Sequence, residues 1–220
     1  MTVLVTGANR GIGLGLVQAA AAAGEDVIGT HRGAPPEAAG VEWMALDVTD
    51  PAGPDALAAR LGDRPLELLV CNAGIYPDKG NRLEDGFAPA DWAAAFAVNV
   101  TGVFLTVRAL LPNLARGDSP RIAIIASAMG SSARAPGGAY IYRATKAAAI
   151  NLGRNLAVDL APRGIAVGIY HPGWVRTDMG GDGADLDADT AVAGLRQRFA
   201  ALSAARTGVF ESYDGTPLEF

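Results

Sequence analysis

The sequence predicts an α/β fold, a doubly wound parallel sheet of about seven strands with helices on both faces. Short apolar runs rich in β-branched residues alternate with longer Ala-rich stretches, and a glycine-rich turn directly follows the first run. The chain has 220 residues, 50% of them hydrophobic, which is enough to bury one sizeable core, and no break in composition calls for two. We therefore expect residues 1–220 to form a single domain.

Six runs are predicted to be strands because each is short, apolar and bounded by turn residues. They are residues 3–6, 27–30, 42–46, 66–71, 121–126 and 165–170. Right-handed crossovers between parallel strands place the ligand crevice beyond their carboxyl ends. Functional residues should therefore follow strands directly.

The Ala-rich stretches between these runs are predicted to be helices, each bounded by a Gly, Pro or Asp signal. They cover residues 12–23, 54–61, 91–115 and 142–161, and Gly24 is the expected C-cap of the first. Residues 178–189 are rich in Gly and Asp without a clear period, which indicates a loop. A further helix is expected over 190–204.

Composition argues against several classes of protein. A net charge of -5 disfavours binding to nucleic acid, which requires a clustered basic surface. The apolar stretch 92–114 is interrupted by Asn99, Arg108 and Pro112, so we expect a buried or interface helix and no membrane span. Cys71 is the only cysteine, and the two histidines are scattered, so no disulfide or metal site is expected. The N-terminus lacks a signal-peptide pattern, which favours the cytoplasm.

The turn after the first strand has the features of a phosphate-binding loop. Glycines there let a pyrophosphate approach the main chain, and the following helix adds free N–H groups and the positive end of its dipole. An ordinary turn that happens to contain three of the 28 glycines is the alternative. The candidate dinucleotide-binding residues are Gly7, Asn9, Arg10, Gly11, Ile12 and Gly13.

Tyr142 and Lys146 stand four residues apart in a predicted helix. Four residues advance about 400°, which places the phenol and the ammonium on one face, one turn apart. Together with a cationic cofactor, the ammonium could supply the roughly 4 kcal/mol that brings the pKa of a tyrosine near neutrality. The pair is a candidate proton donor or acceptor. A packed tyrosine and a solvated lysine are the alternatives.

Three motifs in this order carry a resemblance to a known family. Thr6-Gly7-(x)3-Gly11-x-Gly13, Asn72-Ala73-Gly74 and Tyr142-(x)3-Lys146 resemble the short-chain dehydrogenases/reductases over nearly the whole chain. The segments that begin at Ser127, Gly137 and His171, and the ending at Tyr213, are similar to the C-factor and sniffer-type carbonyl reductases. The resemblance implies a Rossmann-like dinucleotide-binding and catalytic domain, in which residues 178–204 form a loop and a helix over the substrate.

The resemblance also implies catalytic roles. Ser127, after the fifth strand, would hydrogen-bond the substrate carbonyl, and Tyr142 would transfer the proton. Lys146 would lower the phenol pKa and bond the nicotinamide ribose, and Asn99 would hold a water that joins Lys146 to solvent. The alternatives are a turn cap for Ser127, with two nearby serines as weaker competitors for its role, and a helix kink for Asn99.

Further cofactor-binding residues are implied after the third, fourth and sixth strands. They are Asp47 and Val48, then Asn72, Ala73 and Gly74, and finally Pro172, Gly173, Val175 and Thr177. The first group would contact adenine, the second would support adenosine and the central sheet, and the third would flank the nicotinamide. Surface turns and an ordinary loop are the alternatives. Tyr76, Met129, Trp174 and Met179 are candidates for an apolar substrate pocket, or for simple core positions.

The end of the second strand indicates which nicotinamide is preferred. NAD-preferring members of the resembled family place an acidic residue there, but His31 occupies the position. Arg32 comes next and Arg10 sits in the glycine loop, so two guanidiniums could grip a 2'-phosphate. NADP(H) is therefore favoured over NAD(H). A solvated arginine is the alternative for Arg32, and His31 is expected to pack or to stack on adenine.

The leading hypothesis is an NADPH-dependent oxidoreductase that reduces a ketone or aldehyde, or oxidises the alcohol. The alternative is a nucleotide-binding signalling or scaffold protein of the C-factor type with little turnover. The expected partners are a small carbonyl or alcohol and further copies of the chain. A homodimer or homotetramer would form through the helices at 92–115 and 142–161, as the resemblance implies.

Overall fold

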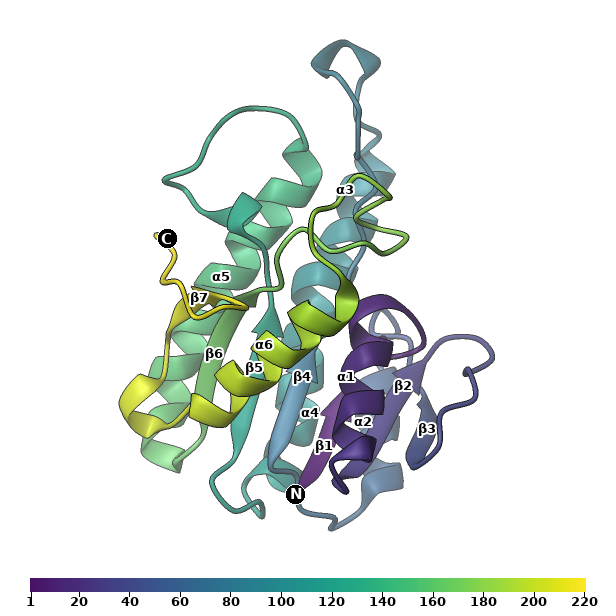
Figure 1. Cartoon of the computed structure of the whole chain (residues 1–220), viewed down its shortest axis with the longest axis vertical. Coiled ribbons are helices and arrows are strands. Elements are labelled where there is room, and N and C mark those ends of the chain that lie inside the picture. The colour runs from purple at the N-terminus through teal and green to yellow at the C-terminus, as the bar shows by residue number, and fades with distance from the viewer.

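Seven strands form one sheet in which every neighbouring pair is parallel (Figure 1). The computed structural model describes residues 1–220. The strand order across the sheet is β3-β2-β1-β4-β5-β6-β7, so the predicted doubly wound α/β fold is confirmed. The strands are β1 (Thr2–Val5), β2 (Asp26–His31), β3 (Val41–Ala45), β4 (Leu68–Cys71), β5 (Arg121–Ile125), β6 (Ala166–His171) and β7 (Phe210–Ser212).

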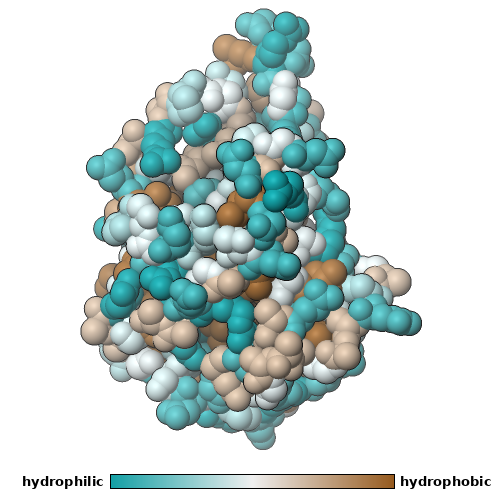
Figure 2. Space-filling view, viewed as in Figure 1, coloured by the Kyte–Doolittle hydropathy of each residue, from teal (hydrophilic) through white to brown (hydrophobic).

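Helices form one layer on each face of the sheet (Figure 1). One layer consists of α1 (Gly11–Ala22) and α6 (Ala188–Ala201), which contact each other. The other consists of α2 (Gly53–Leu61), α3 (Pro89–Phe96), α4 (Gly102–Leu114) and α5 (Tyr140–Leu160). On the face with α1 and α6, hydrophobic residues lie scattered among hydrophilic ones (Figure 2), which is usual for an outer surface.

Successive side chains of each strand enter opposite layers of the core. In β1, Val3 and Val5 belong to the cluster beneath α1 and α6, whereas Leu4 belongs to the cluster beneath α2, α4 and α5. Both faces of the sheet are thereby buried. This explains why the central strands β1, β4, β5 and β6 are nearly continuous apolar runs.

The C-terminal elements differ from the predicted boundaries. Asp187 caps α6 because its Oδ1 accepts a hydrogen bond of 2.7 Å from the Thr190 N–H, which starts the helix at Ala188. The expected extension to residue 204 is wrong, because α6 ends at Ala201 and a separate 3-10 turn follows over Ala204–Arg206. Residues 178–187 lack helix or strand, and we call them the lid segment.

The predicted helix over 91–115 is a helical run with a π-helical turn inside it. α3 continues through π-helix over Ala97–Thr101 into α4. A π-turn widens the helix and breaks the regular i→i−4 pattern, and it occurs often at functional sites. Asn99 therefore lies in an irregular helical turn, which agrees with the helix kink that was the alternative to a water-binding role.

The whole run Pro89–Leu114 is 26 residues long and apolar enough to cross a bilayer by length and composition alone. In this structure it covers the sheet. Its side chains Val103, Val107 and Leu110 belong to the core cluster that also contains residues of β4 and β5. This placement agrees with the expected buried helix.

Asn113 holds the lower part of this helical layer together. It is 2% exposed, and its Nδ2 donates to the carbonyls of Gly62 and Arg64 at 2.8 and 2.9 Å. Both carbonyls belong to the connection between α2 and β4, at the end of the sheet opposite the carboxyl ends of the strands. The amide replaces the water that these carbonyls would otherwise bind.

We expect Asn113→Ala to lower the free energy of unfolding by about 1 to 3 kcal/mol, because two buried carbonyls would lose their partner. Urea unfolding followed by circular dichroism measures the change. Asn155→Ala is the matched control, since Asn155 is exposed and bonds only to Asn151 on its own helix. Equal losses in the two variants would contradict a structural role for the buried amide.

Candidate active site

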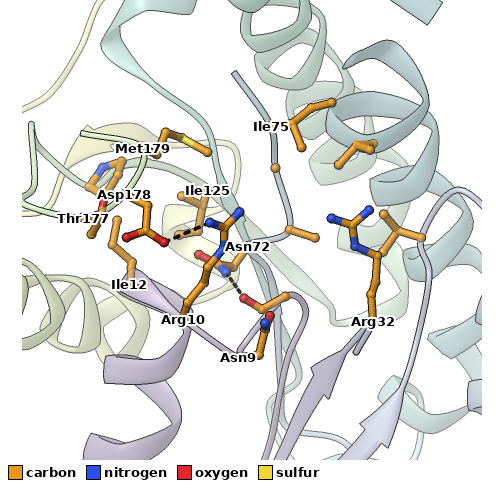
Figure 3. Close-up of a pocket in the computed structure, with 18 of the residues that line it drawn as sticks. Asn9, Arg10, Ile12, Arg32, Asn72, Ile75, Ile125, Thr177, Asp178 and Met179 are labelled. Atoms are coloured by element: carbon orange, nitrogen blue, oxygen red, sulfur yellow. Dashed lines mark hydrogen bonds and ion pairs between the residues drawn. The ribbon is translucent and has the colours of Figure 1, made fainter. Parts of the chain in front are cut away.

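A cleft opens beyond the carboxyl ends of the central strands, beside the point where strand order reverses between β1 and β4 (Figure 3). Such a switch point is where open α/β sheets bind ligands. Most of the predicted cofactor-binding residues line it. They are Gly7, Asn9, Arg10, Gly11, Ile12, Gly13, His31, Arg32, Val48, Asn72, Ala73, Gly74, Tyr142, Lys146, Pro172 and Thr177.

The glycine loop leaves room for a phosphate against the main chain. Gly7 and Gly11 adopt left-handed backbone angles, with φ of 61° and 54°. A Cβ at Gly13 would lie 2.5 Å from Asn72 Nδ2 and 2.6 Å from Gly7 O, so only glycine fits there. The N-cap Arg10 provides no side-chain hydrogen bond to the first turn of α1, and that turn contains no acidic residue. Its N–H groups and dipole therefore suit an anionic pyrophosphate.

Asn72 and Thr6 join the ends of β4 and β1. Asn72 Nδ2 donates to Thr6 O at 2.9 Å and to Gly7 O at 3.0 Å. Thr6 Oγ1 accepts from the N–H groups of Asn72 and Ala73 at 3.0 and 3.1 Å. The side chain of Asn72 therefore supports the sheet and the glycine loop, which is part of the role that the resemblance implied.

Ser127, Tyr142 and Lys146 come together where β5 ends. They are 5%, 7% and 4% exposed. The Ser127 hydroxyl lies beside the Tyr142 phenol, and Ser127 Oγ accepts a hydrogen bond from Met129 N at 3.1 Å, so this serine also caps a turn. Lys146 Nζ lies 5.6 Å from the centroid of the Tyr142 ring and donates to Ile125 O at 2.9 Å.

Burial dominates the titration of this pair. It raises the pKa of Tyr142 to about 12, although the hydrogen bond from Ser127 opposes the shift. Burial also lowers the pKa of Lys146 to about 8. The lysine alone thus does not bring the phenol toward neutrality, and the expected joint effect of the ammonium and a cationic cofactor stays a prediction. The low-dielectric surroundings disfavour both charges, and Lys146 directs its proton to a carbonyl.

Asn99 connects three segments of the site. Its Nδ2 donates to Ile75 O and to Thr145 Oγ1, both at 2.9 Å, and its Oδ1 accepts from Ile75 N at 2.9 Å. Both N–H groups of the side chain are thus bonded to protein, Oδ1 accepts one hydrogen bond, and none joins Asn99 to Lys146. A Cβ at Gly74 would lie 3.4 Å from Asn99 Oδ1 and 3.6 Å from Lys146 Nζ, so the two groups lie on the same side of this glycine.

Arg10 and Arg32, the two arginines predicted to bind a 2'-phosphate, point in different directions in this structure (Figure 3). Arg10 Nη1 pairs with Asp178 Oδ2 at 3.0 Å, so its guanidinium turns toward the lid segment and away from Arg32 (Figure 3). Arg32 lines the cleft near the end of β2. His31 bonds the Gly33 carbonyl and meets the Trp43 ring edge-on, with ring centroids 6.1 Å apart. His31 therefore packs against protein, which is one of the two arrangements expected for it, the other being stacking on adenine.

Three predicted cofactor-binding residues do not line the cleft. Asp47 Oδ1 accepts from Thr49 N and Thr49 Oγ1, a local turn that lowers the pKa of Asp47. Gly173 has a φ of 89° and faces Leu186 and Tyr213. Val175 is buried and forms a bridge with Leu186. Gly173 and Val175 therefore shape the base of the lid segment, and Thr177 and Pro172 reach the cleft.

Several lining residues escaped prediction. Leu46, Ile75, Val98 and Ala126 are apolar residues that each adjoin a predicted site residue in the sequence, and this adjacency is the signal that could have found them. Ile125, two residues before Ser127, also lines the cleft. Asp178 of the lid segment also lines the cleft, as does Met179, which was one of the four candidates for an apolar pocket. Tyr76 stacks on Tyr142, and Lys79 Nζ donates to the carbonyls of Met179 and Gly180 at 2.9 Å. Neither of these two contacts leaves a mark in the sequence.

Comparison with known proteins gives matches across the chain. A family model described as short chain dehydrogenase matches residues 1–185. C-signal of Myxococcus xanthus is 38% identical over 163 residues, which covers 73% of this chain and 96% of that protein.

Solved structures match over the full length. An NADPH-bound carbonyl reductase from chicken fatty liver superposes with a TM-score of 0.90 at 32% identity, covering 100% of this chain and 98% of that one. Carbonyl reductase Sniffer of D. melanogaster gives a TM-score of 0.90 at 29% identity, covering 100% and 99%. The similarity thus extends from the fold to the elements that carry the cleft.

We expect Lys146→Met to raise the free energy of unfolding at pH 7 by on the order of 3 kcal/mol, because the native chain must bury a charged ammonium. Unfolded lysine holds its proton up to about pH 10.5, whereas the folded one loses it near pH 8. Between these values the unfolded state binds more protons, so the native chain gains stability as pH rises.

The stability difference between variant and native chain should therefore shrink from about pH 8 upward. Urea unfolding from about pH 7 to about pH 10 measures it. A difference that stays constant across this range would show that the folded lysine titrates as it does in water.

Proposed function

The chain belongs to the short-chain dehydrogenase family, and we propose that it reduces a ketone or aldehyde carbonyl to the alcohol with NADPH, or catalyses the reverse oxidation. The observation that carries the proposal is the meeting of Ser127, Tyr142 and Lys146 beside a cleft into which the glycine loop opens. The solved carbonyl reductases to which the chain is similar support this reaction type.

Each of the three side chains has a role that its chemistry allows. The Ser127 hydroxyl donates to the substrate carbonyl oxygen, and the Tyr142 phenol delivers the proton to the same oxygen as negative charge develops there. Lys146 holds a positive charge near the phenol and bonds the ribose. Burial of all three excludes water, so that these hydrogen bonds are stronger than they would be in solution.

A nicotinamide cofactor fits the residues that line the cleft, and when bound it supplies the hydride. Gly7, Gly11 and Gly13 with the N-terminus of α1 would hold its pyrophosphate. Pro172 and Thr177 would flank the nicotinamide. Asn99 would hold a water that joins Lys146 to solvent in a proton relay, and its Oδ1, which accepts only one hydrogen bond, can accept a second from that water.

The preference for NADP(H) over NAD(H) is supported by the end of β2. His31 and Arg32 line the cleft there, and no carboxylate is available to bond a ribose 2'-hydroxyl. Arg32 would bind a 2'-phosphate, and Arg10 would join it on leaving Asp178. The similar chicken enzyme is described with NADPH bound.

The proposal includes a homodimer or homotetramer in the cytoplasm. Its contact surface would be the outer faces of the helices at 92–115 and 142–161, where Phe104 and Val158 are 44% and 73% exposed. Light scattering measures the assembly. A signalling or scaffold role without turnover has the similarity to C-signal in its favour, but the presence of all the residues needed for proton transfer argues against it.

We expect Tyr142→Phe to lower kcat by roughly 10²- to 10⁴-fold in the reduction of a panel of ketones and aldehydes, because the proton donor is lost. NADPH oxidation measures turnover, and fluorescence titration measures the Kd for NADPH, which should change by less than about two-fold. Tyr140→Phe on the same helix is the matched control and should keep kcat. Retained turnover in Tyr142→Phe would sink the assignment.

We expect Arg32→Ala to lower kcat/KM with NADPH by roughly 10- to 100-fold, because a charge-assisted bond to the 2'-phosphate is lost. The value with NADH should stay within about two-fold, since NADH lacks that phosphate. Arg60→Ala, at an exposed position on α2, is the control. A parallel fall with both cofactors would contradict the recognition of the 2'-phosphate by this guanidinium.

A further inference from the structure

We propose that Tyr76 and Asp78, on the segment after β4, are positioning residues that hold Tyr142 in place for proton transfer. The inference rests on the proposed function, because it concerns the same proton donor. The two residues that it adds to the site lie outside the glycine loop, outside the segment at Asn72 and outside the pair Tyr142 and Lys146. One of them acts on the backbone of α5, and the other acts on the ring of Tyr142.

The first turn of α5 receives no cap from the residues that directly precede it. Helix starts leave N–H groups unpaired unless a side chain such as Ser, Thr, Asp or Asn accepts from them. The preceding residues here are Gly137, Gly138 and Ala139, which have no polar side chain. Ala139 occupies the N-cap with a left-handed φ of 49°. Tyr142 lies in this first turn, so fraying would move the proton donor.

Asp78 supplies the missing cap from a distant part of the chain. Its Oδ2 accepts from Ile141 N at 2.8 Å, and its Oδ1 accepts from Tyr142 N at 3.2 Å. The residue is 1% exposed, so its carboxylate is fully committed to the interior. A buried charge needs compensation, and the positive end of a 21-residue helix with two N–H donors provides it.

Tyr76 restrains the ring of the same residue. The two tyrosine rings stack with centroids 4.1 Å apart and an interplanar angle of 16°. Stacking at this distance limits the tilt and rotation of the Tyr142 ring. Tyr76 and Asp78, which are separated by a single residue in the sequence, therefore fix the side chain and the backbone of the proton donor.

The segment that carries both residues is itself anchored at each end. Before Tyr76, the N–H and C=O of Ile75 both bond the Asn99 amide at 2.9 Å. After Asp78, Lys79 donates to the carbonyls of Met179 and Gly180 in the lid segment. Such anchoring lets the contacts of Tyr76 and Asp78 act on Tyr142 without the segment itself moving.

The test compares Asp78→Ala and Asp78→Asn with the native protein. A displacement of the phenol by about 1 Å can cost on the order of 10²-fold, so we expect kcat to fall by roughly 10- to 100-fold in Asp78→Ala. Asp78→Asn keeps one acceptor oxygen and should be intermediate. The Kd for NADPH should change by less than about two-fold in both variants. Hydrogen exchange should be faster at the amides of Ile141 and Tyr142.

Asn113→Ala is the matched control, because it also removes two buried side-chain hydrogen bonds to the backbone but lies far from the cleft. It should lower the unfolding midpoint and keep kcat within about two-fold. An equal fall of kcat in Asn113→Ala and Asp78→Ala would overturn the proposal, because lost stability alone would then explain it. Native kcat in Asp78→Ala would overturn it too, whereas a native protein inactive on every carbonyl would overturn the proposed function as well.

Tyr76 provides a second test that does not remove a buried charge. Tyr76→Phe keeps the stacked ring and should keep kcat, whereas Tyr76→Ala removes it and should lower kcat by roughly 10-fold or more. In Tyr76→Ala the Kd for NADPH should stay within about two-fold of the native value. A native kcat in Tyr76→Ala would contradict a positioning role for the ring.

Discussion

The joint between the ends of β1 and β4 is the constraint on which the cleft depends. These two strands are paired in parallel, and beyond the last ladder bond Thr6 and Asn72 continue the connection through side chains. The Asn72 amide also donates to Gly7 O, so the sheet fixes the position of the glycine loop. The strand order reverses at this joint, so the connections that follow β1 and β4 run in opposite directions. The cleft is the space between these two connections. Loss of this joint would therefore disturb the nucleotide loop and the segment that carries Tyr76 and Asp78 together.

Burial sets the ionisation of Tyr142 and Lys146. Tyr142 and Lys146 both resist ionisation in their surroundings, one with its pKa raised and the other with its pKa lowered. Two groups held in this way respond strongly to any charge that enters the cleft, because little water screens them. The protonation of Tyr142 and Lys146 therefore depends on the charge of whatever is bound beside them.

Much of the fold and part of the site could be predicted from the sequence, for local reasons. A continuous apolar strand, a glycine loop and a tyrosine one turn before a lysine each leave a short-range pattern, and the structure places all of them at one end of the sheet. Asp78 could not be predicted in this way. Its contacts lie more than 60 residues away in sequence, and an aspartate in a polar segment looks like a surface residue. The sequence indicates a helix irregularity at Asn99 only as an alternative, because the π-helical turn depends on the buried partners of one amide.

The ion pair between Arg10 and Asp178 links the nucleotide loop to the lid segment. Both side chains are mostly exposed, at 62% and 76%, so the attraction is worth roughly 0 to 1 kcal/mol and weakens with salt. A guanidinium donates hydrogen bonds to carboxylate and to phosphate in the same bidentate geometry, and it favours the more highly charged of the two groups. Arg10 is thus already ordered by a partner that it can exchange at little cost. The lid segment is therefore joined to the glycine loop by a contact that salt and free phosphate can weaken, at the mouth of the cleft.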